Sequence, residues 1–165
     1  MNEERNSRPT AQRQLQASMD ELMPLLVERL EAGQSVKLSP RGISMLPMLR
    51  EGIDSVVLSP VAGKLKKYDI PLYRRPNGQY VLHRIVRVDG ERYTCVGDNQ
   101  YRRERGVEHG SVLAVVTAFQ RGEKECRIDA LSYRVYCRLW HWTRLVRHAC
   151  RAVKRRVIRL FKRKK

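Results

Sequence analysis

The sequence lacks any long apolar run. No segment approaches the roughly 18–20 apolar residues that a membrane-spanning helix needs, and the polar start MNEERNSRPTAQRQ contains no signal-peptide core. We therefore expect a cytoplasmic chain that lies on a membrane without crossing it. The four cysteines also lack CxxC or zinc-finger spacing, so free thiols are expected rather than disulfides or a metal site.

Acidic residues are absent after Asp129. The segment from Arg134 to Lys165 contains thirteen lysines or arginines, whereas the whole chain of 165 residues has a formal net charge of +17. Most of the excess charge is therefore a property of the C-terminal segment. Such a segment predicts an anionic partner, either phospholipid head groups or nucleic acid.

A helix is predicted near the N-terminus, over residues 10–32. Its apolar residues recur every three or four positions, and Gly33 follows where a C-terminal helix cap belongs. These apolar residues are Leu15, Met19, Leu22, Leu26 and Leu30. Residues 1–9 are expected to be disordered. We divide the chain into a start and helix at 1–33, a β domain at 34–125 and a basic helix at 131–165.

The second predicted helix, residues 131–165, carries its apolar residues on one stripe. They are Val135, Leu139, Trp142, Val146, Ala149, Val153, Val157 and Leu160. One interpretation is that this stripe packs the helix on the domain. The other is an amphipathic helix in a membrane interface, with Trp140 and Trp142 at head-group depth. The charge of the last dozen residues favours an anionic membrane surface, and nucleic acid is the less favoured partner.

The middle of the chain predicts short antiparallel strands. Six runs have strand character: QSVKLS, DSVVLSP, DIPLYRR, QYVLHRIVRVDG, RYTCVGD and SVLAVVTAFQRG. Residues 76–78 (Pro-Asn-Gly) and 89–90 (Asp-Gly) are hairpin signals. We therefore expect a mainly β (α+β) fold, a small curled antiparallel sheet or barrel flanked by N- and C-terminal helices.

Three short segments contain residues suited to acyl transfer. Ser44 lies in the corner GISMLP, and a serine needs a nearby base because its free hydroxyl is a poor nucleophile. His83, in YVLHRIV, is a polar residue in an apolar run and titrates near neutral pH. Asp98, in the turn GDNQ, could orient a histidine. Each residue also has an ordinary interpretation, as a turn serine, a hydrogen-bonded structural histidine or an Asx-turn.

Taken in order, GISMLP, YVLHRIV and GDNQ resemble the boxes of the signal peptidase I superfamily, which includes the LexA-like self-cleaving repressors. The resemblance covers roughly residues 35–118 and is to the histidine-base type of the endoplasmic reticulum and archaea. It implies that Ser44 is the nucleophile, His83 the general base and Asp98 the orienting acid, with Glu104 and Glu108 as alternatives for the acid. No metal or cofactor is implied. Two features depart from the family pattern: Tyr68-Asp69 stands where the family usually has Gly-Asp, and we expect no N-terminal transmembrane anchor.

The function expected from these residues is hydrolysis of a peptide bond in a peptide or protein substrate, by a Ser-His mechanism at the cytoplasmic membrane face. One alternative is a non-catalytic, peptidase-like binding module with a basic tail for membrane or nucleic acid. Another is a self-cleaving regulator, because Ala32-Gly33 resembles a cleavage pair of such repressors. The first 33 residues are, however, too short for a helix-turn-helix domain.

Overall fold

The computed structural model describes residues 19–144, 146–147, 149–150 and 153. Helix α1 (Met19–Glu31) covers the second part of the predicted N-terminal helix. Residues 1–18, which include the predicted disordered start and Leu15, lie outside the described residues. Leu26 and Leu30 of α1 are buried in the core, as their spacing predicted. Gly33 ends the helix with φ of 76°, which confirms the predicted cap.

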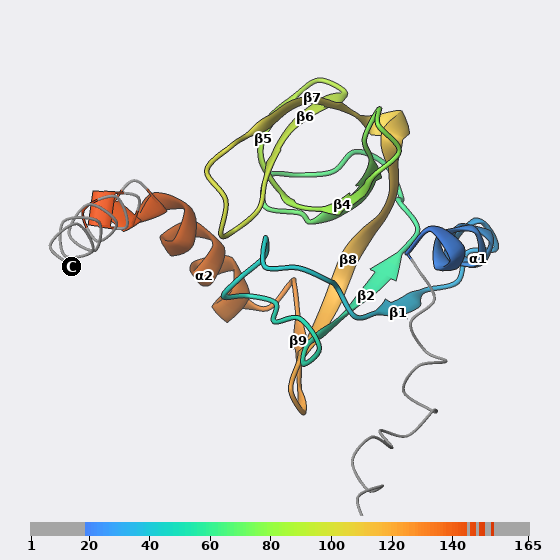
Figure 1. Ribbon diagram of the computed structural model, residues 1–165, viewed down its shortest axis with the longest axis horizontal. Coiled ribbons are helices and arrows are strands. Elements are labelled where there is room, and N and C mark those ends of the chain that lie inside the picture. The colour runs from blue at the N-terminus through green and yellow to red at the C-terminus, as the bar shows by residue number, and fades with distance from the viewer. Residues whose placement is uncertain (1–18, 145, 148, 151–152, 154–165) are drawn as a thin grey trace, which may run out of the picture.

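The body of the protein consists of antiparallel strands in two sheets (Figure 1). One sheet has the order β1-β2-β8-β3-β4, with β9 paired to β8, and the other has the order β5-β6-β7. The strands of the first sheet are β1 (Val36–Leu38), β2 (Ser55–Ser59), β3 (Pro71–Arg74), β4 (Tyr80–Leu82), β8 (Val112–Arg121) and β9 (Lys124–Arg127). Those of the second are β5 (Arg84–Asp89), β6 (Arg92–Val96) and β7 (Glu104–Glu108). A mainly β, α+β fold is thus confirmed, whereas neither described sheet closes into a barrel.

The six predicted strand runs all contain strands, but one of them is divided. The run QYVLHRIVRVDG forms β4 in one sheet and β5 in the other, and His83 is the residue between them. The prediction that His83 lies within a single strand is therefore wrong, because the chain crosses between sheets at this point. Both predicted hairpins are present, since 76–78 joins β3 to β4 and 89–90 joins β5 to β6.

Two strands, β7 and β9, were not predicted. Their sequences, ERGVE and KECR, are mostly polar and lack an apolar alternation. Each pairs with only one neighbour, β7 with β6 and β9 with β8. Without an apolar alternation, a short polar segment carries only a weak strand signal.

Most of the core lies where α1, the six-stranded sheet and the start of the C-terminal helix meet. It is formed by residues of α1, by Met45, Met48 and Leu49 of the loop after β1, and by β2, β3 and β8. A smaller cluster beside the three-stranded sheet includes Tyr73 and Tyr93. Helices α1 and α2 (Leu131–Trp142) lie on opposite sides of the sheets in the view of Figure 1.

Helix α2 docks through the face opposite to the predicted stripe. Tyr133 and Cys137 are buried in the core. The stripe is instead exposed: relative exposure is 43% for Val135, 54% for Leu139, 81% for Trp142, 64% for Val146 and 58% for Val153. The interpretation that this stripe packs on the domain is therefore wrong.

Beyond Trp142 the predicted helix is described only in part. Thr143 is a turn residue, although its N–H still donates to Leu139 O at 2.9 Å, and helical conformation is described at 144, 146–147, 149–150 and 153. Val157, Leu160 and the most basic part of the predicted helix lie outside the described residues. No helix in the described part of the chain is long and apolar enough to cross a membrane.

Candidate active site

Ser44 lies in the turns that connect β1 to β2 and is partly exposed. The loop is anchored in the core by the buried side chains of Met45, Met48 and Leu49. It is also held by the GDNQ turn, because the backbone N–H of Asn99 donates to Ser44 O at 2.9 Å and Asn99 Nδ2 donates to Ile43 O at 3.1 Å. The predicted serine corner and the predicted turn are thus in direct contact.

The end of the same loop is held by Asp54, whose exposure is 1%. Its carboxylate accepts hydrogen bonds from Arg50 N at 2.8 Å, from Arg50 Nε at 3.0 Å and from the N–H of Gly122 at 3.1 Å. Hydrogen bonds from Arg50 outweigh the effect of burial and keep the pKa of Asp54 below its usual value. A buried carboxylate with this many donors ties the serine loop to the β8–β9 turn.

His83 is almost completely buried, with an exposure of 2%. On one side of the ring, Nδ1 lies 3.0 Å from Glu104 Oε1 and 3.4 Å from Tyr73 Oη. On the other side, Nε2 faces Gly97. A Cβ added at Gly97 would lie 3.1 Å from His83 Nε2 and 2.6 Å from Ser44 O. Gly97 is therefore the point where the serine loop and the imidazole come together.

Glycine is required at position 97 by this close approach. A Cβ at 2.6 Å from a backbone oxygen would overlap with it, since an ordinary C···O contact is about 3.3 Å or longer. Among the described residues, no hydrogen bond joins the Ser44 hydroxyl to His83. The structure thus brings the loop of Ser44 and the ring of His83 together at Gly97 without a direct Ser-His bond.

Glu104 is the acid beside His83, and it is held in place by Arg75. Arg75 Nε donates to Glu104 Oε2 at 2.8 Å, and Arg75 Nη2 donates to Oε1. Burial alone would raise the pKa of Glu104, but the hydrogen bonds from Arg75 and Tyr73 and the nearby His83 lower it. Glu104 is therefore ionised when the site is at neutral pH.

The electrostatics of the site keep His83 neutral. Burial lowers the pKa of His83, and the charge of Arg75 lowers it further, whereas the carboxylate of Glu104 partly opposes both effects. A neutral imidazole next to a carboxylate donates its Nδ1 hydrogen to that carboxylate, which leaves the lone pair on Nε2. This tautomer directs the basic nitrogen of His83 towards Gly97 and the serine loop.

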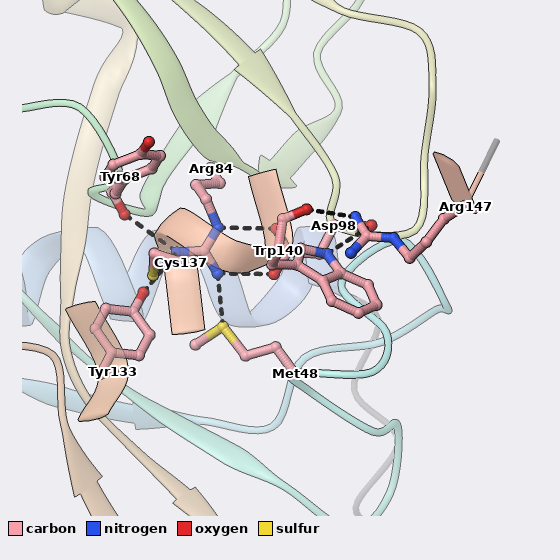
Figure 2. A network of polar contacts seen from close by, with 8 residues as sticks. All are labelled: Met48, Tyr68, Arg84, Asp98, Tyr133, Cys137, Trp140 and Arg147. Carbon is pink, nitrogen blue, oxygen red and sulfur yellow. Dashed lines mark hydrogen bonds and ion pairs between the residues drawn. The ribbon is translucent and has the colours of Figure 1, made fainter. Parts of the chain in front are cut away.

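Asp98 does not lie behind His83, where the sequence pattern predicted it. Its carboxylate accepts two hydrogen bonds from Arg84, at 2.8 Å from Nε and at 2.7 Å from Nη2 (Figure 2). Both side chains are 3% exposed. Successive side chains of an extended chain point to different sides, so the neighbouring Arg84, and not His83, meets the carboxylate. The third candidate, Glu108, is exposed and pairs with Arg92 at 3.5 Å.

Arg84 also connects the GDNQ turn to α2. Its Nη1 donates to Tyr133 Oη at 2.7 Å and contacts Cys137 Sγ at 2.9 Å, and Nη2 contacts Met48 Sδ at 2.8 Å (Figure 2). A buried guanidinium with a full set of partners is a strong constraint on all the groups around it. The serine loop, the GDNQ turn and α2 therefore share one buried network.

Trp140 completes this connection. Its indole N–H donates to Asp98 O at 3.1 Å, and the Arg147 guanidinium lies 3.3 Å from the ring centroid (Figure 2). Trp140 thus faces the domain and not the exposed stripe, which corrects the expectation that both tryptophans lie at a membrane interface. Trp142 alone is on the exposed side.

The suggested cleavage pair Ala32-Gly33 is bound into the end of α1. Ala32 N donates to Glu28 O at 3.0 Å and Gly33 N donates to Leu30 O at 3.0 Å. All four cysteines are free thiols, as predicted. Within the described residues, no group of three or more His, Cys, Asp or Glu side chains is placed to hold a metal ion.

A comparison of the chain with protein families, with curated proteins and with solved structures finds no match. The assignment of a function therefore depends on the geometry of the site. Glu104 was one of two alternatives to Asp98 in the sequence analysis, and Arg75 was not identified from the sequence. Glu104 lies on the unpredicted strand β7, opposite Cys95 of β6, and Arg75 directly follows β3 at the base of the β3–β4 turn.

Proposed function

We propose that the protein is a serine endopeptidase of the signal-peptidase-like type, with Ser44 as nucleophile, His83 as general base and Glu104 as the orienting acid. The observation that carries this proposal is the contact at Gly97, which brings His83 Nε2 and the serine loop together while Glu104 occupies Nδ1. A buried base with its second nitrogen on a carboxylate is the arrangement that activates a serine.

In the proposed reaction, Ser44 Oγ attacks the substrate carbonyl carbon and His83 Nε2 accepts the hydroxyl proton. The tetrahedral intermediate collapses when His83 returns that proton to the leaving amine, which gives an acyl-serine and releases the C-terminal product. Water then attacks the ester with His83 again as base, and Ser44 is regenerated. Glu104 stabilises the imidazolium that forms in each step, and the backbone N–H of Ser44 is one donor for the oxyanion.

Tyr68 has a backbone conformation that is unusual for its side chain. It has φ of 82°, a left-handed conformation that glycine adopts readily and a tyrosine does not. The family pattern has glycine at this position, before the aspartate that corresponds to Asp69. A glycine would adopt this positive φ without strain, so the different side chain at this position does not argue against the resemblance.

The test of catalysis is cleavage of a proteome-derived peptide library by purified full-length protein, read by mass spectrometry. We expect Ser44→Ala and His83→Ala to abolish the cleavages. Ser39→Ala is the matched control, because Ser39 is an exposed serine in the same connection between strands, and it should cleave like the wild type. Cleavage that persists in Ser44→Ala would show that the activity belongs to another protein or another residue.

The pH profile separates His83 from other bases. Burial lowers the pKa of His83, so the acid limb of activity should lie below about pH 6.5, the usual imidazole value. Glu104→Gln removes the charge that opposes this shift, and it should move the limb to still lower pH as well as reduce turnover. An acid limb that Glu104→Gln leaves unchanged would contradict the assignment of Glu104 to His83.

We further propose that the exposed stripe of the C-terminal helix holds the domain on an anionic membrane surface. Leu139, Trp142 and Val146 are spaced for one helical face and are more than half exposed. The opposite face is already occupied by the contacts of Tyr133 and Cys137 with the domain. An amphipathic helix with an apolar face and many basic residues binds the interface of anionic lipid.

Flotation of the full-length protein with vesicles tests this location. The protein should float with vesicles that contain phosphatidylserine and stay behind with phosphatidylcholine alone. Leu139→Ser should weaken flotation, whereas Leu25→Ser, at a leucine of 52% exposure on α1, should not. Truncation of the chain after Asp129 is unsuitable as a test, because removal of α2 strips the buried Arg84 of Tyr133 and Cys137. Binding of duplex DNA or RNA in the absence of vesicle binding would instead support a nucleic-acid tail.

A binding module without turnover is the second candidate function. The observation that favours it is the lack of a hydrogen bond between the Ser44 hydroxyl and His83 in the described structure. Catalytic hydrogen bonds in substrate-free enzymes are often long and tighten in the complex, so the geometry is compatible with both functions. A protein that binds peptide and vesicles but cleaves nothing in the library, and in which Ser44→Ala behaves like the wild type, is such a module.

A further inference from the structure

A wide groove opens on the Tyr73 and Glu104 side of the candidate site. It has a volume of about 1700 Å³ and runs between the β3–β4 hairpin and the segment 99–108. Its wall includes Tyr73 and Glu104, which contact His83, and Asn99, which contacts the backbone of Ser44. Ser44 and His83 are not themselves part of this wall, and Asn99 connects the groove to the serine loop, so a peptide bound at Ser44 reaches the groove past the GDNQ turn.

The groove is strongly basic. It is lined by five arginines, which are Arg74, Arg75, Arg102, Arg103 and Arg105. Its two acidic residues are both paired, Glu104 with Arg75 and Glu108 with Arg92, which lies outside the groove.

Three of the arginines, Arg102, Arg103 and Arg105, are exposed. None of the three has an ion-pair partner among the residues that the structure describes. Their positive charge is therefore available to a ligand in the groove.

We propose that this groove binds an acidic segment of the peptide substrate next to the cleaved bond. That the ligand is a substrate rests on the proposed peptidase function. That the ligand is acidic rests on the three exposed arginines, which have no ion-pair partner among the described residues. Carboxylates are the side chains that arginine forks recognise best, and a cleft lined by one sign of charge concentrates ligands of the opposite sign. The arginines on this wall would then select for Asp or Glu at some positions beside the scissile bond.

A peptide fits the groove better than a nucleic acid does. Proteins that bind single-stranded nucleic acids without sequence preference combine a basic groove with exposed aromatic rings on which successive bases stack. The aromatic residues of the groove are Tyr73 and Tyr101. Tyr73 is 1% exposed and is engaged with His83 and Glu104, and Tyr101 is only partly exposed. The groove therefore offers charge without a stacking platform.

The test measures binding to full-length Ser44→Ala, so that no cleavage is needed. The probes are a fluorescein-labelled peptide GDEGDEGDEG, its uncharged counterpart GNQGNQGNQG, and a labelled ten-nucleotide oligothymidylate, each followed by fluorescence anisotropy at low salt. The groove variant adds Arg102→Ser and Arg105→Ser. The matched control adds Arg134→Ser and Arg138→Ser, which remove the same charge from exposed positions of α2.

We expect the acidic peptide to bind more tightly than the uncharged one. The groove variant should bind the acidic peptide about fivefold more weakly than the control variant does, because it loses two exposed ion pairs with the peptide. Equal weakening in both variants would overturn the proposal, because the attraction would then be that of net charge. Tighter binding of the oligothymidylate, lost in the groove variant, would also overturn it in favour of nucleic acid. Groove-dependent binding in a protein that cleaves no peptide would contradict the peptidase function and leave the acidic-peptide groove intact.

Discussion

Replacement of Gly97 by alanine tests the contact on which the proposed site depends. The new Cβ would lie 2.6 Å from Ser44 O and 3.1 Å from His83 Nε2. A relaxed C···O distance is about 3.3 Å, so the loop and the turn must separate by roughly 0.7 Å. Ser44 O belongs to the backbone and accepts from Asn99 N, so it cannot move aside as the end of a flexible side chain can.

The expected cost is that of overpacking at a tight contact. We expect Gly97→Ala to lower the free energy of unfolding by about 1–3 kcal/mol, measured from the midpoint and slope of urea denaturation. Gly110→Ala is the matched control, because a Cβ there meets nothing within 4 Å and the residue has no left-handed backbone. Its free energy of unfolding should stay within about 0.5 kcal/mol of the wild type.

The two glycine variants also separate stability from activity. If the proposed function is right, Gly97→Ala should lose turnover even at temperatures where it is fully folded, because the serine loop has moved away from His83. Gly110→Ala should retain turnover. Equal urea midpoints for the two variants would refute the close approach of the serine loop to position 97, and with it the geometry of the site.

Three further predictions concern buried groups. Asp98→Asn leaves a buried guanidinium without its carboxylate, so urea denaturation should show a loss of about 3–5 kcal/mol, and an unchanged midpoint would contradict the network. Because burial lowers the pKa of His83, the unfolded chain takes up a proton at higher pH than the folded protein does, below about pH 6.5. The stability that the neutral ring confers is therefore complete above that pH and is lost on acidification. NMR titration should show a still lower pKa for His83 in Glu104→Gln, and a higher value would count against the pair. Ellman's reagent should label the exposed Cys150 in the native protein but not Cys95, whose pKa burial raises to about 12, and immediate labelling of both would disprove the packing.

Local patterns in the sequence were sufficient for several elements of the fold. The spacing of Leu26 and Leu30 with Gly33 determines a helix and its end, because both depend on residues within a few positions of each other. The two hairpins were also predictable, since Pro-Asn-Gly and Asp-Gly specify tight turns by their own backbone preferences. Strands β7 and β9 were not, because their mostly polar sequences carry no apolar alternation.

The candidate nucleophile and base could be identified from the sequence, but their surroundings could not. Ser44 and His83 stood out as polar residues at a sharp corner and in an apolar run. The acid beside His83 was left open among three carboxylates. Register decided it: β7 pairs with β6 and brings Glu104 to the imidazole, while Asp98 binds the neighbouring Arg84 on the other side of the chain.

The C-terminal helix shows the same division. Its sequence alone determined an apolar stripe and a strongly basic end, because both are properties of residue spacing and charge. Which face meets the domain was decided only in three dimensions. Arg84 is buried and needs polar partners, and Tyr133 and Cys137 supply them from the face opposite to the stripe. The stripe is thereby left exposed, because satisfying a buried charge has a larger free-energy consequence than covering a few aliphatic side chains.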